Sequence, residues 1–350
     1  MSMTGSKGAI QVYAVSPYFQ ITSIVLVVFS LAAMFMYSEY FVKIKDGYEE
    51  VLPLTPQRAL EFGGRPAEVQ VGMAIRDFPF FDMSKGAFSI DVSVYFLFDP
   101  RLVSVDRIGD FLFKRAELLF RKDPVIKIID EKLFVQYDLR LKFDVSLDYQ
   151  DFPFDGHRIN FVLYHPRLSP GEVVYTAVRN DFFINPDIET PGWSLIDRRV
   201  STGYEEERLV VEAGAAAASF HPSAVFSLDF DRVGARHIMT IFVPLLLIFF
   251  VALLSLSLDP LSGTRSTMLS LAAASITALI TYRFVIESMS PAVGYLLIVD
   301  YIFLVFLMFC CLVFLVTIFG ARISARYKSF IAGLLQLAVV LTFAYFFFWV

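Results

Sequence analysis

The stretch Asp148–Phe161 reads DYQDFPFDGHRINF, with a proline between two phenylalanines and an aspartate on either side of them. The segments around it, Phe134–Leu147 and Arg158–Tyr164, alternate like β-strands. A simple turn would need only Pro153 to fix φ and the aspartates to bond backbone donors. It would not need two aromatic rings. Exposed aromatic side chains at a loop tip indicate that the tip inserts into another part of the protein.

The chain is too apolar for an ordinary soluble protein. Of its 350 residues 56% are hydrophobic and only 19% are charged, and most charges lie between Glu39 and Arg236. Spans of about 20 apolar residues are long enough to cross a bilayer as helices. We expect five such helices, at Phe19–Ser38, Ile238–Leu258, Thr267–Glu287, Tyr295–Phe319 and Ser329–Val350. The sequence therefore predicts a membrane protein with one large polar domain.

Positive charges in the short loops predict the orientation. Arg322, Arg326 and Lys328 lie between the last two spans and Arg265 between the second and third, whereas Ser288–Gly294 has no positive charge. The positive-inside rule then puts the basic loops and the N-terminus in the cytoplasm, and the large domain outside a plasma (inner) membrane, extracellular or periplasmic. The first apolar run is longer than that of a signal peptide, so we expect an uncleaved anchor; a cleaved signal peptide is the alternative.

The sequence carries none of the usual signals of an enzyme. It has no glycine-rich phosphate loop, no cluster of metal ligands and no nucleophile motif, and its four histidines are scattered. The two cysteines, Cys310 and Cys311, are adjacent within the fourth span and cannot cross-link the polar domain. A net charge of −5 gives no nucleic-acid footprint. We expect no enzymatic activity, no cofactor and no metal site.

The polar domain reads as an antiparallel β-sandwich. In Phe88–Phe98 every second residue is large and apolar, which predicts one buried and one solvated face. We also expect a helix at Asp106–Arg121 and a helical turn at Gln57–Phe62. The predicted strands are Val69–Ile75, Phe88–Phe98, Leu133–Leu147, His157–Tyr164, Glu172–Val178, Glu206–Ala213 and Ala224–Arg232.

Small and polar side chains recur at steps of three and four along the third apolar span, on one face of a helix. We call them the α-helical stripe: Ser266, Ser270, Ala274, Thr277, Thr281, Phe284 and Ser288. A single hydroxyl in a membrane helix usually bonds its own i−4 carbonyl or allows close packing. A whole stripe, with bulky aliphatic residues on the other sides, predicts a water-filled lumen. One copy cannot enclose a lumen, so the stripe implies an oligomer.

The loop and the spans together resemble the pentameric ligand-gated ion channels, or Cys-loop receptors. The hallmark loop of that family has the form C-P-M-D-L-x-x-F-P-F-D-x-Q-x-C, and Val145–Ile159 falls on it without a gap. Val145 and Ile159 stand at the two cysteine positions, as in bacterial members, and His157 stands at the glutamine. The resemblance covers roughly residues 67–350 and extends through Gly86–Leu102, Ile241–Leu247 and Ser290–Phe303.

The resemblance implies a homopentameric, prokaryotic-type channel gated through its outer domain. Its fold would be an outward-facing antiparallel β-sandwich followed by a four-helix transmembrane bundle, with one extra N-terminal transmembrane helix. The domains would be 1–40 (N-terminus and anchor helix), 41–66 (linker), 67–236 (sandwich) and 237–350 (pore domain). Its partners would be further copies of itself, membrane lipids, a small-molecule or ion ligand at subunit interfaces, and permeating ions, with cations favoured.

The resemblance also implies roles in the pore. The stripe would line it, but Thr277 stands where the family has a leucine ring, and the acidic residue at the inner mouth is missing. Glu287 near the outer end would form an acidic ring unless Arg283, four residues away, pairs with it. Phe284 is the one large apolar residue of the stripe and is the expected gate, because a ring of phenylalanines closes by dewetting.

Two further sets of residues follow from the resemblance. The coupling loop would dock on Ser288–Gly294, with an aspartate near the start of the second span; the residues are Asp151, Phe152, Pro153, Phe154, Asp155, Arg236 and Pro291. A ligand between subunits would meet aromatic residues suited to a cation: Tyr95, Tyr164, His165, Tyr204 and Phe220. The alternative for each of these aromatics is an ordinary place in the sandwich.

Two other functions remain in competition with a channel. A membrane-tethered sensor or scaffold could keep the same fold without conducting ions. A secondary transporter would need inverted repeats and intramembrane charges, and the sequence shows neither.

Overall fold

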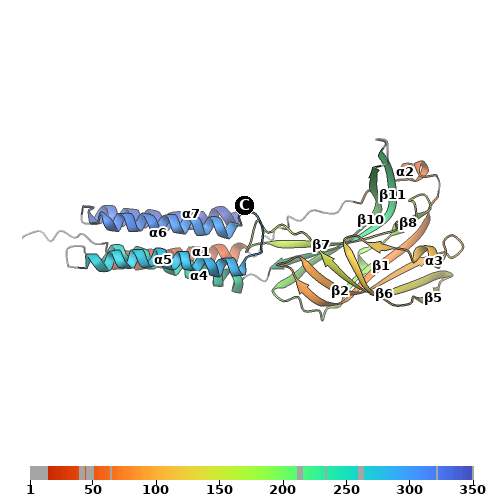
Figure 1. The fold of residues 1–350 in the computed structure, drawn as a ribbon, viewed down its shortest axis with the longest axis horizontal. Helices are drawn as coiled ribbons and strands as arrows, with labels where there is room; N and C mark the ends of the chain where they lie inside the picture. The colour runs from red at the N-terminus through yellow and green to blue at the C-terminus, as the bar shows by residue number, and fades with distance from the viewer. Residues whose placement is uncertain are drawn as a thin grey trace, which may run out of the picture. The chain divides into compact units, whose positions relative to one another are not determined.

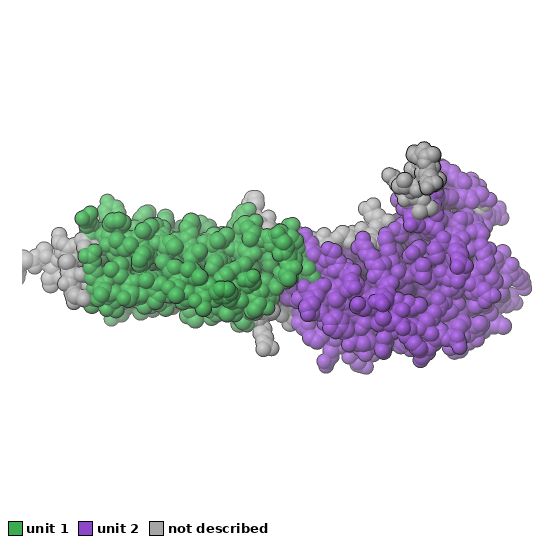
Figure 2. All heavy atoms as spheres, viewed as in Figure 1, with its two compact units in different colours: residues 1–42, 149–154, 234–350 green, residues 43–148, 155–233 purple. Residues whose placement is uncertain are grey.

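The computed structural model divides the chain into two compact units (Figure 2). The helical unit comprises Met1–Val42, Tyr149–Phe154 and Gly234–Val350, and the sheet unit comprises Lys43–Asp148 and Asp155–Val233. The structure describes residues 15–38, 44, 51–63, 65–210, 216–232, 235–258, 264–320 and 322–348.

The sheet unit consists of two β-sheets (Figure 1). In the seven-stranded sheet the order is β4-β6-β2-β1-β8, with β5 also pairing with β6 and β9 with β1; the four-stranded sheet has the order β10-β11-β7-β3. The first sheet is formed by β1 (Ala67–Asp82), β2 (Ala87–Phe98), β4 (Ala116–Arg121), β5 (Val125–Ile129), β6 (Lys132–Asp144), β8 (Val173–Thr176) and β9 (Phe182–Ile184). The second is formed by β3 (Leu112–Phe113), β7 (Gly156–Tyr164), β10 (Trp193–Val210) and β11 (Ala216–Arg232).

The core lies between the two sheets, as in a sandwich. On β2 the alternate residues from Phe88 to Phe98 are all fully buried, which confirms the predicted apolar face. Rings from the two sheets meet there: Phe88 and Phe143 of the first sheet lie 6.0 and 5.2 Å from Phe161 of the second. The seven-stranded sheet is not purely antiparallel, because β8 and β9 both pair with β1 in parallel, whereas the four-stranded sheet is antiparallel throughout.

One predicted element of this unit is wrong. Only Val105–Ile108 (α3) is helical within the expected helix Asp106–Arg121, and strands β3 and β4 follow it. Arg115 takes a positive φ of 56°, which a helix does not allow, and β4 pairs with β6 instead. The expected helical turn is present as α2 (Pro56–Glu61), which begins with Thr55 as a side-chain cap.

The helical unit contains the five apolar spans as helices. They are α1 (Pro17–Ser38), α4 (Ala235–Leu254), α5 (Arg265–Met289), α6 (Ile298–Ile318) and α7 (Ala325–Phe348), and the 3-10 turn η2 (Ser255–Ser257) follows α4. All five are long and apolar enough to cross a membrane. This agrees with the expectation of a membrane protein, and each helix lies within a few residues of its predicted span.

Contacts between these helices place α5 and the additional helix α1. Helix α5 packs against α4 and α6, and α1 packs against α7 and α4. The buried side-chain amide of Gln20 donates to the carbonyl oxygen of Leu253 at 2.9 Å, and the backbone N–H of Val15 donates to that of Leu256 at 3.2 Å. Since the last carbonyls of a helix have no intrahelical donor, α1 caps the end of α4.

Candidate functional site

Helix α5 has one packed face and one open face. Its buried residues all lie on one side: Met268, Ala272, Ser275, Leu279 and Ile286. All seven residues of the stripe are exposed. At about 100° per residue the stripe occupies a single arc of the helix. The polar line predicted from the sequence is thus the face that the helix does not use for packing within its own chain.

The two threonine hydroxyls of the stripe donate to carbonyls of their own helix. Thr277 Oγ1 donates to the carbonyl of Ala273 at 3.2 Å, and Thr281 Oγ1 donates to that of Thr277 at 3.0 Å. Their hydroxyl hydrogens are therefore engaged, and only the oxygen lone pairs remain for other contacts. The stripe offers hydrogen-bond acceptors to whatever lies against it.

The two charged residues near the C-terminal end of α5 do not pair with each other. Arg283 does not pair with Glu287 but forms an ion pair with Asp300 on α6, and its guanidinium lies 5.6 Å from the centre of the Phe303 ring. Asp300 also accepts from the backbone N–H of Leu297 at 2.9 Å. Glu287 is exposed and makes no ion pair with any residue in the described parts of the chain.

The aromatic loop inserts into the helical unit. Residues Tyr149–Phe154 come between strands β6 and β7 in the chain, yet they cluster with the helices. Phe152 is fully buried. The ring of Phe154 stacks on that of Phe242 of α4, with centroids 5.7 Å apart and planes 7° apart. Of the two phenylalanines that are out of place in a turn, Phe152 is therefore buried and Phe154 has an aromatic partner.

Backbone groups of the same loop cap the beginning of α6. The N–H groups of Ile298 and Val299 donate to the carbonyls of Gln150 and Phe152 at 3.0 and 3.3 Å. The N–H of Tyr149 donates to the Tyr295 hydroxyl at 3.0 Å. The first N–H groups of a helix lack intrahelical acceptors, so the loop satisfies two donors that α6 cannot satisfy itself.

These contacts lie just beyond the expected docking region. The expected partner was Ser288–Gly294 with Pro291, whereas the loop bonds to Tyr295, Ile298 and Val299. The side chain of Arg236, also expected there, lies outside the described residues. Asp151 and Pro153 are buried within the loop.

Asp155, the residue after the loop, is held by two basic side chains. It is completely buried and accepts two hydrogen bonds from Arg232 at 2.7 and 2.8 Å, and its Oδ2 lies 2.8 Å from His157 Nε2. Arg232 lies over the Trp193 ring at 4.3 Å. Burial alone would raise the Asp155 pKa, but hydrogen bonds from His157 and Arg232 outweigh it and lower the pKa to about 2.

This pair joins two chain connections that lead to the helical unit. Asp155 directly follows the aromatic loop, and Arg232 is three residues before α4 begins at Ala235. The pair therefore fixes the start of β7 to the end of β11, which are the points where the sheet unit connects to the loop and to α4.

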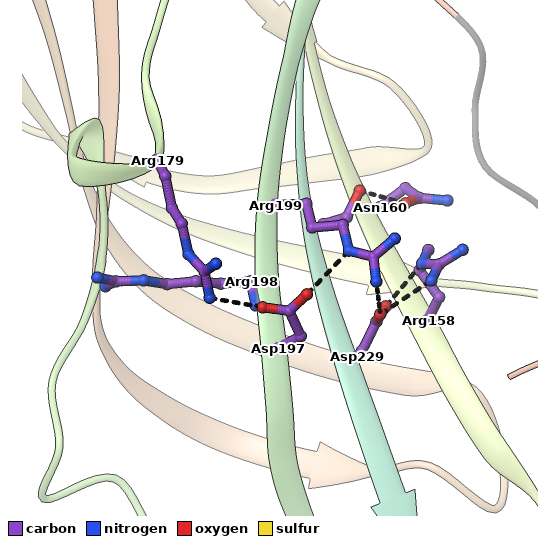
Figure 3. A network of polar contacts seen from close by, with 8 residues as sticks. Arg158, Asn160, Arg179, Asp197, Arg198, Arg199 and Asp229 are labelled. Atoms are coloured by element: carbon purple, nitrogen blue, oxygen red, sulfur yellow. Dashed lines mark hydrogen bonds and ion pairs between the residues drawn. The ribbon is translucent and has the colours of Figure 1, made fainter. Parts of the chain in front are cut away.

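A second network lies beside this pair on the four-stranded sheet (Figure 3). Arg158 of β7 makes two buried hydrogen bonds to Asp229 of β11 at 2.6 and 2.8 Å, and the two residues are cross-strand partners. Arg199 of β10 lies 3.8 Å from Asp229 and 2.9 Å from Asp197, which also pairs with Arg179 at 2.6 Å. These residues were not predicted from the sequence. The signal that could have identified them is a charged side chain inside a predicted strand.

Two of the five expected ligand residues have intramolecular roles. Tyr95 donates to Asp181 at 2.7 Å and stacks on Phe134 at 5.4 Å; burial, followed by the Asp181 carboxylate, raises its pKa. His165 is buried, with Nε2 2.6 Å from the carbonyl oxygen of Arg107 and Nδ1 accepting from the N–H of Leu168 at 3.0 Å. It holds a turn.

The structure brings two other expected ligand residues together. Tyr204 and Phe220 lie 5.8 Å apart across the hairpin β10–β11, and both contact Phe62, which follows α2, at 5.3 and 5.1 Å. The predicted linker is attached here as well, because Leu52 and Tyr204 exchange two backbone hydrogen bonds of 2.9 Å. The fifth residue, Tyr164, contacts the ring of His221 at 6.4 Å.

Comparison with known proteins adds no assignment. No family model matches the chain, and no curated protein matches it.

Proposed function

We propose that the chain is the subunit of a homopentameric ligand-gated ion channel of the prokaryotic Cys-loop receptor type. The observation that carries the proposal is the open face of α5. In a membrane helix an exposed face of hydroxyl oxygens is unfavourable against lipid and favourable against water. Copies of α5 arranged around an axis would bring these faces onto a common lumen. Helices α4–α7 would form the pore-domain bundle, with α1 as an additional helix against α7.

Charge and hydrogen-bonding capacity favour cations as the permeating ions. The engaged hydroxyls of Thr277 and Thr281 leave acceptor oxygens, which suit a hydrated cation. Arg283 is neutralised by Asp300, so it does not oppose the exposed carboxylate of Glu287. Repeated around a ring, Glu287 would attract cations near that end of the pore.

The loop offers a physical route for gating. It caps α6 with its carbonyls and stacks Phe154 on α4, while Asp155 beside it is fixed to Arg232 before α4. A displacement of either strand end is transmitted directly to the ends of two membrane helices. The loop is therefore the coupling element of the proposal.

A non-conducting membrane-tethered sensor is the second candidate. It is favoured by one observation, that Thr277 and Thr281 bond to their own backbone as hydroxyls in purely packing helices also do. In this candidate the loop would still connect the sheet unit to the helices, and only the lumen would be missing.

Phe154→Ser should uncouple activation from opening, because it removes the ring stacked on Phe242 and leaves the backbone caps of α6 in place. We expect a channel that assembles and binds an activator but no longer opens in bilayer recordings. Phe183→Ser, at an exposed phenylalanine of β9, is the matched control and should open normally. Normal opening of the Phe154 variant would mean that the loop is only a turn.

Assembly tests the proposal without an activator. Native mass spectrometry of the purified protein in mild detergent should give a ring of identical chains, since one open face cannot close a lumen. The resemblance to the pentameric channels sets the expected number at five. A stable monomer or dimer would exclude the channel and leave the sensor.

A further inference from the structure

The seven-stranded sheet carries a cavity on the face that is not packed in the core. Its volume is about 350 Å³, and it is formed by residues of β1, β2, β4 and β6 and the residue after β4: Arg76, Asp91, Phe120, Lys122, Asp138, Leu139 and Arg140. A volume of this size is near the lower end of the range for small-molecule sites. The cavity shares no residue with the aromatic set expected to bind an activator.

The acidic and basic side chains of the cavity differ in their exposure to solvent. The two carboxylates are the less exposed groups, with 26% of the Asp91 side chain and 19% of the Asp138 side chain accessible. The three basic side chains are more exposed, at 47% for Arg76, 60% for Lys122 and 49% for Arg140. A molecule that approaches the cavity therefore meets three cations first, with two anions below them.

The carboxylates are already engaged. Asp91 accepts two hydrogen bonds from Arg140 at 2.6 and 2.7 Å. The hydrogen bond from Arg140 is the largest cause that lowers the Asp91 pKa, and the charges of Arg76 and Lys122 also lower it. The charges of all three cations thus act on the Asp91 carboxylate, and Asp77 offsets part of the Arg140 charge.

Asp138 is shared among several donors. It accepts from Ser93 at 2.8 Å, Gln136 at 3.1 Å and Arg76 at 3.1 Å, and Lys122 lies at 4.0 Å. Within the part of the chain that the structure describes, Lys122 therefore pairs only with a carboxylate that other donors share.

An apolar wall stands beside the excess positive charge. The Phe120 side chain is 54% exposed, and the buried Leu139 completes the lining. We propose that the cavity binds a small organic carboxylate, whose charge lies against Lys122 and Arg76 and whose apolar body lies on Phe120. Charge-assisted hydrogen bonds to the carboxylate and burial of the ring supply the affinity. The site is independent of ion conduction.

Isothermal titration of the full-length protein in detergent tests the site with benzoate as the probe and benzamide as its neutral isostere. We expect saturable benzoate binding and at least about tenfold weaker benzamide binding, or about 1.4 kcal/mol. Lys122→Gln and Phe120→Ala should each weaken benzoate binding by a similar factor. Lys127→Gln, at a lysine of β5 outside the cavity, is the matched control and should bind like the wild type.

Three results would overturn the site. They are no saturable benzoate binding, equal binding of benzoate and benzamide, or an equal loss in Lys122→Gln and Lys127→Gln, which would indicate a general ionic effect. Should Lys122→Gln fail to fold, the exposed Phe120→Ala variant still decides. Failure of the channel proposal would leave the titration unaffected, since the readout is binding to the sheet unit.

Discussion

Arg232→Gln should destabilise the sheet unit by about 3–5 kcal/mol, the cost of leaving a buried charge without its partner. Asp155 is completely buried, and Arg232 supplies two of its hydrogen bonds. Glutamine can replace at most part of this bonding and none of the charge. The substitution also removes the cation from the Trp193 ring. Both losses act on the same strand ends.

Trp193 reports on this site directly. The chain has two tryptophans, so a Trp349→Phe background makes its fluorescence specific. Denaturant unfolding followed at Trp193 should show the loss of stability in Arg232→Gln. The control is Arg167→Gln, whose ion pair with Asp110 is largely exposed and should contribute no more than about 1 kcal/mol. A change in Arg232→Gln as small as in the control would contradict the account.

The pH dependence of this pair has a definite sign. The folded-state pKa of Asp155 is about 2, below its ordinary value of 3.8. A lowered carboxyl pKa contributes stability above the unfolded value, and that stability is lost as the pH falls through the folded value. The free energy of unfolding of the wild type, followed by Trp193 fluorescence, should therefore fall between about pH 4 and pH 2. Asp155→Asn should lack this part of the pH dependence.

Phe284→Ala should produce a constitutively leaky channel. The Phe284 side chain is 71% exposed on the open face of α5, so it does not contribute to packing within its own chain. Its neighbours on the stripe, Thr281 and Ser288, are small and polar. Only a ring of phenylalanines at this level is large and apolar enough to exclude water, and alanine removes it.

Resting conductance in reconstituted vesicles measures this effect. Because the ring is exposed within the chain, the variant should retain its folding and its oligomeric state. Phe330→Ala on α7, at a phenylalanine that is 67% exposed, is the matched control and should leave the resting conductance unchanged. Unchanged resting conductance in Phe284→Ala as well would place the closed barrier elsewhere.

Local patterns were enough to predict the main elements of the fold. The alternation at Phe88–Phe98 identified the buried face of β2, and hydropathy located all five long helices. Local patterns failed at Asp106–Arg121, where apolar spacing suits helix and strand alike and the positive φ of Arg115 leaves no sequence signal.

The contacts of the candidate site depend on pairings that are distant in sequence. The sequence left open whether Arg283 pairs with Glu287, and its partner proves to be Asp300, 17 residues away. The loop carbonyls accept from the first N–H groups of α6, and the position of these groups depends on where that helix begins, at Ile298. Asp155 and Arg232 are 77 residues apart, and only the register of β7 and β11 brings them together.

Single-channel recording from the purified protein in a planar bilayer shows whether the chain forms a conducting pore lined by α5. We expect discrete, cation-selective current steps. In a background without Cys310 and Cys311, a water-soluble thiol reagent should block them in Thr281→Cys but not in Leu279→Cys. Thr281 lies on the open face of α5 and Leu279 on the buried face. Two results would contradict the proposed pore: pentamers that enter the bilayer but give no current steps, or equal block of Thr281→Cys and Leu279→Cys.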